Sequence, residues 1–455
     1  MNPASRLALM IAVVFGTVVP PAPGGEDPPA PPIAARYAAI MAEYEGAMAR
    51  YRQAMEKVET QAEANKAFRE LAPDELAFSR RMNELAATDP ASPTARDALV
   101  WVVDKPGRVD RGAYGDEFAR ASALLVRHHG DDPRAIEVGL RLNNSVTAHR
   151  DALVFGFLAA AKGRESMGLA RLAAAQYLEE KAKFARGTRS MKAGHKYKLM
   201  GVIGEDGKLH DKEVEQSAEE YADILLLRQV DPDALRAEAE RLFEEVASDY
   251  GDVVHVSAKV RELEALAKEP NPTWQGKPLS EAERQQLAEI VARRPTLGEL
   301  AGARLDEMHN LKVGQPAPEI MGVDFEGKPL KLSDYKGKVV ALVFWATWCG
   351  PCMREIPRER DLVERLKDRP FALLGVNSDR DPAAAHQALA SERITWPNWQ
   401  DGGPETGPIV ARYHVRGFPT VLVLDSQGII RFKDLHGESI DRAVDKLLGE
   451  MAPNP

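Results

Sequence analysis

Two cysteines at the point where an expected strand meets an expected helix constrain this chain more than any other feature. Cys349 and Cys352 are the only cysteines among its 455 residues, and Gly350 and Pro351 separate them. An apolar run rich in β-branched residues covers 339–344 just before them, and a helical pattern follows them. So few cysteines exclude a disulfide-rich scaffold and any zinc or iron–sulfur site built from four cysteines. The setting predicts a redox-active pair of thiols at the start of a helix.

The expected helix start gives the two sulfur atoms different chemical roles. Cys349 would face unpaired backbone N–H groups and the positive end of the helix dipole, which both favour a thiolate. We therefore expect a depressed pKa for Cys349 and a nucleophilic role, with a more buried Cys352 resolving the mixed disulfide. Pro351 fits the first helical turn, where a missing N–H group costs little. The alternatives are a structural disulfide and half of a metal site, which would need two further ligands from ten scattered histidines.

Residues 1–24 have the pattern of an export signal. Arg6 supplies the positive charge, an apolar run covers 7–19, and Ala22-Pro23-Gly24 provides small residues for cleavage. The run is short for a membrane span, which needs about 17–25 residues. We expect cleavage, with an uncleaved membrane anchor as the alternative. The mature chain would lie in the periplasm or another extracytoplasmic compartment, where disulfides persist.

The pattern that follows the signal is a Pro-rich tether and then a long helical region. The tether covers 25–33, and Ala, Glu, Arg and Leu dominate 34–310, with apolar residues three and four positions apart. Asp132-Pro133 and Asp231-Pro232 predict helix starts, with Asp as the N-cap and Pro in the first turn. Two Glu-Glu pairs lie 65 residues apart, which suggests helical-hairpin repeats, but an irregular bundle is favoured because the fuller repeat pattern is missing. The expected helices are 34–72, 114–129, 135–142, 168–184, 213–227, 232–250 and 280–294.

Strands and helices alternate in the last part of the chain, which predicts an α/β domain over 313–455. The expected strands are 339–344, 371–377 and 420–424, and the expected helices are 351–366, 382–393 and 439–451. The predicted fold class is therefore α + α/β: a large helical amino-terminal region, with repeats as one option, and a carboxyl-terminal α/β domain.

The charge balance and the motifs exclude several functions. The chain has 60 Lys and Arg residues against 69 Asp and Glu residues, a formal charge of −9. So acidic a chain is a poor general nucleic-acid binder, because duplex affinity comes mainly from cations placed on phosphates. No phosphate-binding loop and no dinucleotide fingerprint follows a strand. We therefore expect no bound cofactor and no metal, and electrons would come from another protein.

Residues 313–455 resemble the thioredoxin fold, and more closely the extracytoplasmic TlpA/ResA-type thiol–disulfide oxidoreductases of the redoxin superfamily. The resemblance is carried by the opening 313–318, by 325–338, by the active-site strand and loop 343–352, and by Gly417-Phe418-Pro419-Thr420. These motifs are spread over the whole domain, which is about a third of the chain. The helical region carries no such resemblance.

This resemblance implies further catalytic residues beside the two cysteines. Pro419 would be cis and abut the Cys349 sulfur, leaving the neighbouring backbone to pair with an extended substrate strand. Glu355 stands where the family often has an active-site acid, and it would move protons for Cys352. An ordinary trans loop and a solvated glutamate are the respective alternatives.

The resemblance also implies a substrate-binding surface of Trp348, Phe418 and Thr420. Trp348 would cover the sulfur and shape the docking surface, with core packing as the alternative, and the bulk of Phe418 would narrow the choice of partners. In one respect the chain departs from classical thioredoxins, which carry a buried acid on the active-site strand. That position is Val343 here, which strengthens the case for Glu355.

The leading functional hypothesis is an extracytoplasmic oxidoreductase that reduces disulfides of envelope proteins by exchange through Cys349 and Cys352. A thiol electron-donor protein would restore the dithiol, and a membrane would be a partner only if the signal stays uncleaved. Reduction is favoured over oxidation because Gly350-Pro351 resembles the more reducing members of the family.

Two other functions stay open. The first is a thiol peroxidase of the redoxin group, because 313–338 also resembles that superfamily. Peroxiredoxins have Thr three residues before the peroxidatic Cys, however, and Ala346 occupies that position here. The second is a binding scaffold formed by 34–310, with the redox domain as an appendage.

Overall fold

The computed structural model describes ten stretches of the chain and divides them into two compact units. The stretches are 31–58, 60–104, 112–142, 146–188, 196–203, 209–215, 218–274, 277–292, 294–403 and 407–451. One unit lies within Met1–Val102 and Ile203–Leu209, and the other lies within Val103–Val202 and His210–Pro455. The expected export signal and most of the tether lie outside the described residues.

The first unit is helical. It contains α1 (Ile33–Met55), α2 (Gln61–Leu71), α3 (Glu75–Thr88) and most of α4 (Pro93–Val103). The ring of Tyr44 on α1 meets Phe78 of α3 and Trp101 of α4 edge to face, at centroid distances of 5.3 and 5.0 Å. The single helix expected over 34–72 is therefore wrong. The chain is interrupted after α1, and a capping box at Thr60 starts α2 as a separate helix.

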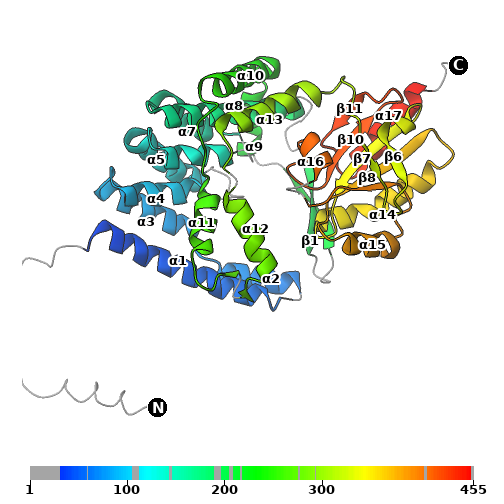
Figure 1. Cartoon of the computed structure of the whole chain (residues 1–455). Helices are drawn as coiled ribbons and strands as arrows, with labels where there is room; N and C mark the ends of the chain where they lie inside the picture. The colour runs from blue at the N-terminus through cyan, green and yellow to red at the C-terminus, as the bar shows by residue number, and fades with distance from the viewer. Residues whose placement is uncertain are drawn as a thin grey trace, which may run out of the picture. The chain divides into compact units, whose positions relative to one another are not determined.

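The second unit begins with a further set of helices and two short strand pairs. These elements are α5 (Gly112–His129), α6 (Pro133–Ile136), the 3₁₀ helix η2 (Glu137–Arg141), α7 (Ala148–Ala160), α8 (Arg164–Thr188), β1 (Lys196–Ile203), β2 (Leu209–Glu215), α9 (Ala218–Leu227), α10 (Pro232–Asp249), α11 (Ala258–Ala267), β3 (Thr273–Trp274), β4 (Lys277–Pro278), α12 (Glu281–Ala292) and α13 (Leu297–Asn310). Helix α8 packs mainly against α10, and α10 packs against α13. This part of the chain is labelled in cyan and green in Figure 1.

The two Asp-Pro pairs start helices as predicted. The carboxylate of Asp132 accepts a hydrogen bond from the backbone N–H of Arg134 at 2.9 Å, and Asp231 accepts one from Asp233 at 2.9 Å. Two other expectations fail in part. The helix expected over 135–142 continues as 3₁₀ helix after Ile136. The helix expected over 213–227 begins only at Ala218, because the preceding residues pair as β2 with β1, a partner that local sequence does not reveal.

The carboxyl-terminal domain, yellow to red in Figure 1, is built on a five-stranded sheet in the order β11-β10-β7-β8-β9. Strand β7 runs parallel to β8 and antiparallel to β10, β8 runs parallel to β9, and β10 runs antiparallel to β11. The elements are β5 (Met321–Val323), β6 (Pro329–Lys331), the 3₁₀ helix η3 (Leu332–Tyr335), β7 (Val339–Trp345), α14 (Gly350–Arg365), β8 (Phe371–Asn377), α15 (Pro382–Ser391), β9 (Asn398–Gln400), α16 (Pro408–Arg412), β10 (Thr420–Leu424), β11 (Ile430–Lys433) and α17 (Glu438–Met451).

Strand β7 is buried along its whole length because apolar layers cover both faces of the sheet. Val339, Ala341 and Val343 face a core shared with α14 and α17, whereas Val340 and Leu342 face a second core beside β6 and α16. This alternation follows the two-residue period of a strand. The arrangement confirms the α + α/β fold class and a thioredoxin-like domain.

The described residues contain no helix that combines the length and the apolar character needed to cross a bilayer. The apolar run 7–19 lies outside the described residues.

Candidate functional site

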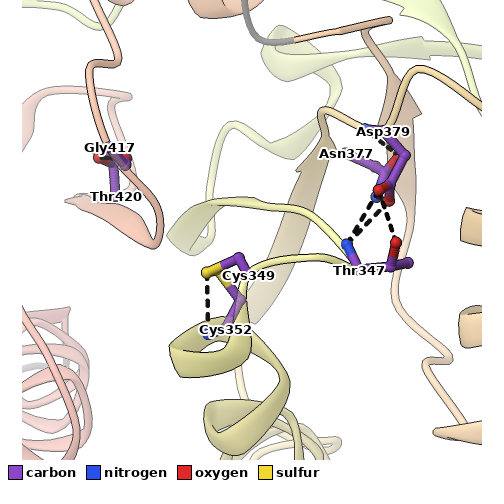
Figure 2. Close-up of a disulfide and its surroundings, with 7 residues drawn as sticks. All are labelled: Thr347, Cys349, Cys352, Asn377, Asp379, Gly417 and Thr420. Atoms are coloured by element: carbon purple, nitrogen blue, oxygen red, sulfur yellow. Dashed lines mark hydrogen bonds between the residues drawn. A yellow bond between two sulfur atoms is a disulfide. The ribbon is translucent and has the colours of Figure 1, made fainter. Parts of the chain in front are cut away.

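The two cysteines form a disulfide at the junction of β7 and α14 (Figure 2). Cys349 is the N-cap of α14, and its side chain accepts a hydrogen bond from the backbone N–H of Cys352 at 3.2 Å. Their exposed fractions are 5% and 2%, respectively. A donor that points at a sulfur stabilises that sulfur when it becomes a thiolate. The geometry is therefore suited to holding charge on Cys349 after the disulfide opens.

The peptide bond between Phe418 and Pro419 is cis, as predicted, so the alternative of an ordinary trans loop is wrong. Figure 2 shows Thr420, whose hydroxyl donates to the carbonyl of Gly417 at 2.8 Å, a bond that closes the turn around the proline. Trp348 is 58% exposed, so its core-packing alternative is also wrong. The Trp348 ring meets the Phe418 ring edge to face at 5.4 Å. This contact joins the cysteine loop to the cis-proline loop.

A buried carboxylate holds the loop that precedes the cysteines (Figure 2). Asp379 is 2% exposed and accepts two hydrogen bonds from Thr347: one from the backbone N–H at 3.0 Å and one from the hydroxyl at 2.7 Å. The amide of Asn377 donates a third, at 2.7 Å. A buried charge is tolerated when donors surround it. This group therefore fixes Thr347, two residues before Cys349.

We did not predict the hydrogen bonds of Asp379 from the sequence, although a signal was present. Asn377, Ser378 and Asp379 are polar residues at the carboxyl end of an expected strand. Parallel neighbours end at the same edge of a sheet, and the active-site loop leaves that edge from β7. The pairing of β7 with β8 was needed to bring the two together.

Glu355 lies on α14 one turn after Cys352, and its side chain is only 12% exposed. The solvated-glutamate alternative is therefore wrong. Its Oε2 atom is buried and has no hydrogen-bond partner among the described residues. The guanidinium of Arg358 approaches Oε2 to 4.0 Å, beyond hydrogen-bond distance, and itself donates to Asp441 at 3.1 Å. This Glu355 oxygen is therefore buried without a hydrogen-bond donor among the described residues.

A second acid on α14 was not predicted. Glu359 is 7% exposed, and it follows Cys352 and Ile356 on the apolar face of the helix. Burial, and then the negative charge of Glu355, raise the pKa of Glu359 to about 8. Its position on the apolar stripe of α14 was a signal that could have identified it. Val343 is buried in the adjacent core, so this strand carries no acid at that position.

Among the described residues, no group of three or more His, Cys, Asp or Glu side chains is placed to hold a metal ion.

The Asp379 network should stabilise the folded domain. In Asp379→Asn, the new amide would face three donors from Thr347 and Asn377, leaving a buried donor without an acceptor. We expect a loss of about 1–3 kcal/mol in the free energy of unfolding, measured by urea denaturation of the oxidised protein. Asp368→Asn, at an exposed position, is the control. An unchanged midpoint for Asp379→Asn would contradict the assignment.

The buried Glu359 should make stability depend on pH. Its folded-state pKa of about 8 lies above the unfolded value of roughly 4.3, so its favourable contribution is complete below the unfolded pKa and declines as pH rises to the folded pKa. The free energy of unfolding should therefore fall by at most about 5 kcal/mol across this window. Glu359→Gln should remove most of this slope, measured by urea denaturation at several pH values.

Glu364→Gln provides the matched control for that experiment, because Glu364 is on the same helix with its side chain 73% exposed. It should keep the slope of the original chain. Identical slopes for Glu359→Gln and the original chain would show that Glu359 is ionised in the folded state at neutral pH.

Comparison with known proteins agrees with this geometry. The redoxin family profile matches residues 312–448. Thiol-disulfide oxidoreductase ResA of Bacillus thuringiensis is 29% identical over 143 residues, which cover 31% of this chain and 80% of that protein. Thioredoxin-like protein YneN of Bacillus subtilis is 35% identical over 129 residues, which cover 28% of this chain and 72% of that protein.

The thioredoxin domain of a thiol-disulfide oxidoreductase from Bacteroides vulgatus is 29% identical, with 30% of this chain and 99% of that chain covered and a TM-score of 0.29. The resemblance that the sequence motifs suggested is confirmed by the family profile and by the curated relatives. Through its carboxyl-terminal domain, the chain belongs to the redoxin family and is a thioredoxin-like thiol–disulfide oxidoreductase of the ResA/TlpA type.

Proposed function

We propose that this chain reduces disulfide bonds of partner proteins outside the cytoplasm, through Cys349 and Cys352. The observation that carries the proposal is the position of Cys349 as the N-cap of α14, where the N–H of Cys352 points at its sulfur. The helix dipole adds to this hydrogen bond, and both favour a thiolate once the pair is reduced. A thiolate, and not a thiol, attacks a disulfide.

The first step is attack of the Cys349 thiolate on one sulfur of the partner disulfide. A bond forms between the two sulfurs, the partner's disulfide bond breaks, and its second sulfur leaves as a thiolate. Cys352 then gives its proton to the Glu355 carboxylate and attacks the Cys349 sulfur. This forms the Cys349–Cys352 disulfide, releases the first partner sulfur, and leaves a proton for the departing thiolates. The partner gains two electrons, and a thiol electron-donor protein later restores the dithiol.

The surface around the disulfide suits an extended polypeptide. Trp348 is exposed and contacts Phe418, so an apolar surface lies beside the cysteine loop. Pro419 has no N–H, and its cis bond precedes Thr420 at the start of β10. We assign Trp348, Phe418 and Thr420 to partner binding and Pro419 to the choice of polypeptide over small thiols.

The proposed location rests on the amino-terminal sequence. Residues 1–24 combine a charged start, a short apolar run and small residues in the order of an export signal. A dithiol outside the cytoplasm has to be kept reduced by a donor, because disulfides persist there.

The peroxidase alternative gains no support at the site. Thr347 is two residues before Cys349, and its hydroxyl donates to Asp379. The position three residues before Cys349 is Ala346, which has no hydroxyl to offer a peroxide.

Replacing Cys352 with Ala should stop the reaction after the first step. We expect partner proteins to stay covalently joined to Cys349 in cells that express the full chain, and a thiol reductant should release them. Gel electrophoresis without reductant, followed by mass spectrometry of the adducts, measures this. The control is the variant with both Cys349→Ser and Cys352→Ala, which should carry no adducts.

Two results would contradict the proposal. One is a Cys352→Ala chain that is exported at normal level but carries no adducts. The other is a reduction potential for the cysteine pair near about −120 mV, which is typical of strong oxidants and would make the chain an oxidase.

A further inference from the structure

One face of α14 carries a sulfur and two acids in register. Glu355 follows Cys352 by three positions, and Glu359 follows Glu355 by four. Residues three and four apart lie on the same side of a helix, one above the other. The three side chains therefore form a short row that leads from the resolving sulfur into the core.

Apart from the Arg358 guanidinium, which lies 4.0 Å from Glu355, the two acids in this row have little that would hold a negative charge. Glu355 has a buried oxygen without a hydrogen bond, and the described residues donate no hydrogen bond to Glu359. Ile356 and Leu362 belong to the apolar core beside them. Burial in these surroundings raises the pKa of Glu359.

The charged groups on neighbouring elements do not supply the missing partner. The strands β7 and β8 contain no charged residue. Helix α17 presents acids, and the two arginines of α14 that lie nearest engage them. Arg358 bonds Asp441 at 3.1 Å, and Arg365 bonds Asp445 at 2.8 Å. On α14 itself, Arg360 has a buried Nε atom without a hydrogen-bond partner among the described residues, and it is not among the groups that shift the pKa of Glu359.

Glu355 and Glu359 are four residues apart on α14, so the charge on one acts on the other. Loss of both protons would place two negative charges on neighbouring turns of α14, so the pair retains one proton to higher pH. The charge of Glu355 acts on Glu359 in this direction. When both carboxyl groups have ionised, the pair binds a proton about as strongly as a cysteine thiolate does. Similar proton affinities favour proton transfer from the Cys352 thiol to the pair.

We propose that Glu355 and Glu359 act as one coupled acid pair in the resolving step, with Glu359 as a positioning residue that sets how strongly Glu355 takes the proton of Cys352. This inference rests on the proposed function, which assigns proton transfer to Glu355. The proton passes from the Cys352 thiol to the pair, the Cys352 thiolate attacks the Cys349 sulfur, and the pair returns the proton to the partner sulfur that leaves.

A chromogenic aromatic disulfide tests the pair, because it releases one coloured thiolate in each of the two steps. The reduced full chain is mixed with the reagent, and the second release reports the attack by Cys352. In Glu359→Gln, we expect the second release to slow by about tenfold or more near pH 8, while the first release keeps its rate. Below about pH 6 the two chains should differ little, because the acid pair retains its proton there.

A cycle of variants separates this role from a structural one. Glu359→Gln should have no further effect on the second release in a chain that already carries Glu355→Gln, because Glu359 acts through Glu355. Glu359→Met also removes the carboxyl group, and it leaves an apolar side chain in its place. It should slow the second release as Glu359→Gln does. Near pH 8, both variants should be at least as resistant to urea as the original chain. A slower second release would then not result from a loss of stability. Glu364→Gln is the control and should behave as the original chain.

The outcomes distinguish failure of this inference from failure of the proposed function. A slow second release in Glu355→Gln, together with a normal one in Glu359→Gln, would overturn the role of Glu359 alone. An effect of Glu359→Gln that persists in the Glu355→Gln chain would overturn the coupling. A normal second release in Glu355→Gln would remove the proton-transfer role that the proposed function assigns to Glu355.

Discussion

The direct passage of β7 into α14 is the constraint on which the rest of the site depends. Strand β7 is buried between two apolar cores, so its carboxyl end is held by packing on both faces of the sheet. The helix that follows after the short loop has Cys349 as its N-cap, with a backbone N–H directed at the sulfur at 3.2 Å. The packing of β7 therefore fixes where α14 begins, and the start of α14 sets the surroundings of the Cys349 sulfur.

The buried polar groups around this segment differ in what surrounds them. Asp379 receives donors from Thr347 and Asn377, and a carboxylate with such partners serves as a fixed anchor for the loop. Glu355 and Glu359 lie among apolar side chains without comparable donors. Groups that lack partners are costly to bury as charges, so they hold or exchange protons instead. The first arrangement positions the loop, and we propose that the second supplies proton chemistry.

Three strands of the sheet, β7, β8 and β10, and the active-site helix could be predicted because their signals are local. The apolar run before Cys349 and the Pro in the first turn are readable from adjacent residues, and so is the cis bond before Pro419 once the family resemblance is recognised. The roles of Asp379 and Glu359 depend on which strand pairs with β7 and on which face of α14 is buried. Charged residues suggest solvent in a single sequence, and only the packing shows otherwise.

In the helical region, too, features set by adjacent residues were predicted and features set by distant or competing partners were missed. The two Asp-Pro helix starts are confirmed, because the N-cap carboxylate and the proline act on their own turn. The break between α1 and α2 and the pairing of β1 with β2 were missed. The first depends on a capping box that competes with continued helix, and the second depends on a partner strand.

The ionisation of Cys349 tests the central claim most directly. The rate of alkylation by iodoacetamide should be measured against pH in the Cys352→Ala variant, where Cys349 has no disulfide partner. The account predicts a midpoint at least one unit below the ordinary thiol pKa of about 8.5, because the helix end stabilises the thiolate. A midpoint at or above that ordinary value would contradict the account.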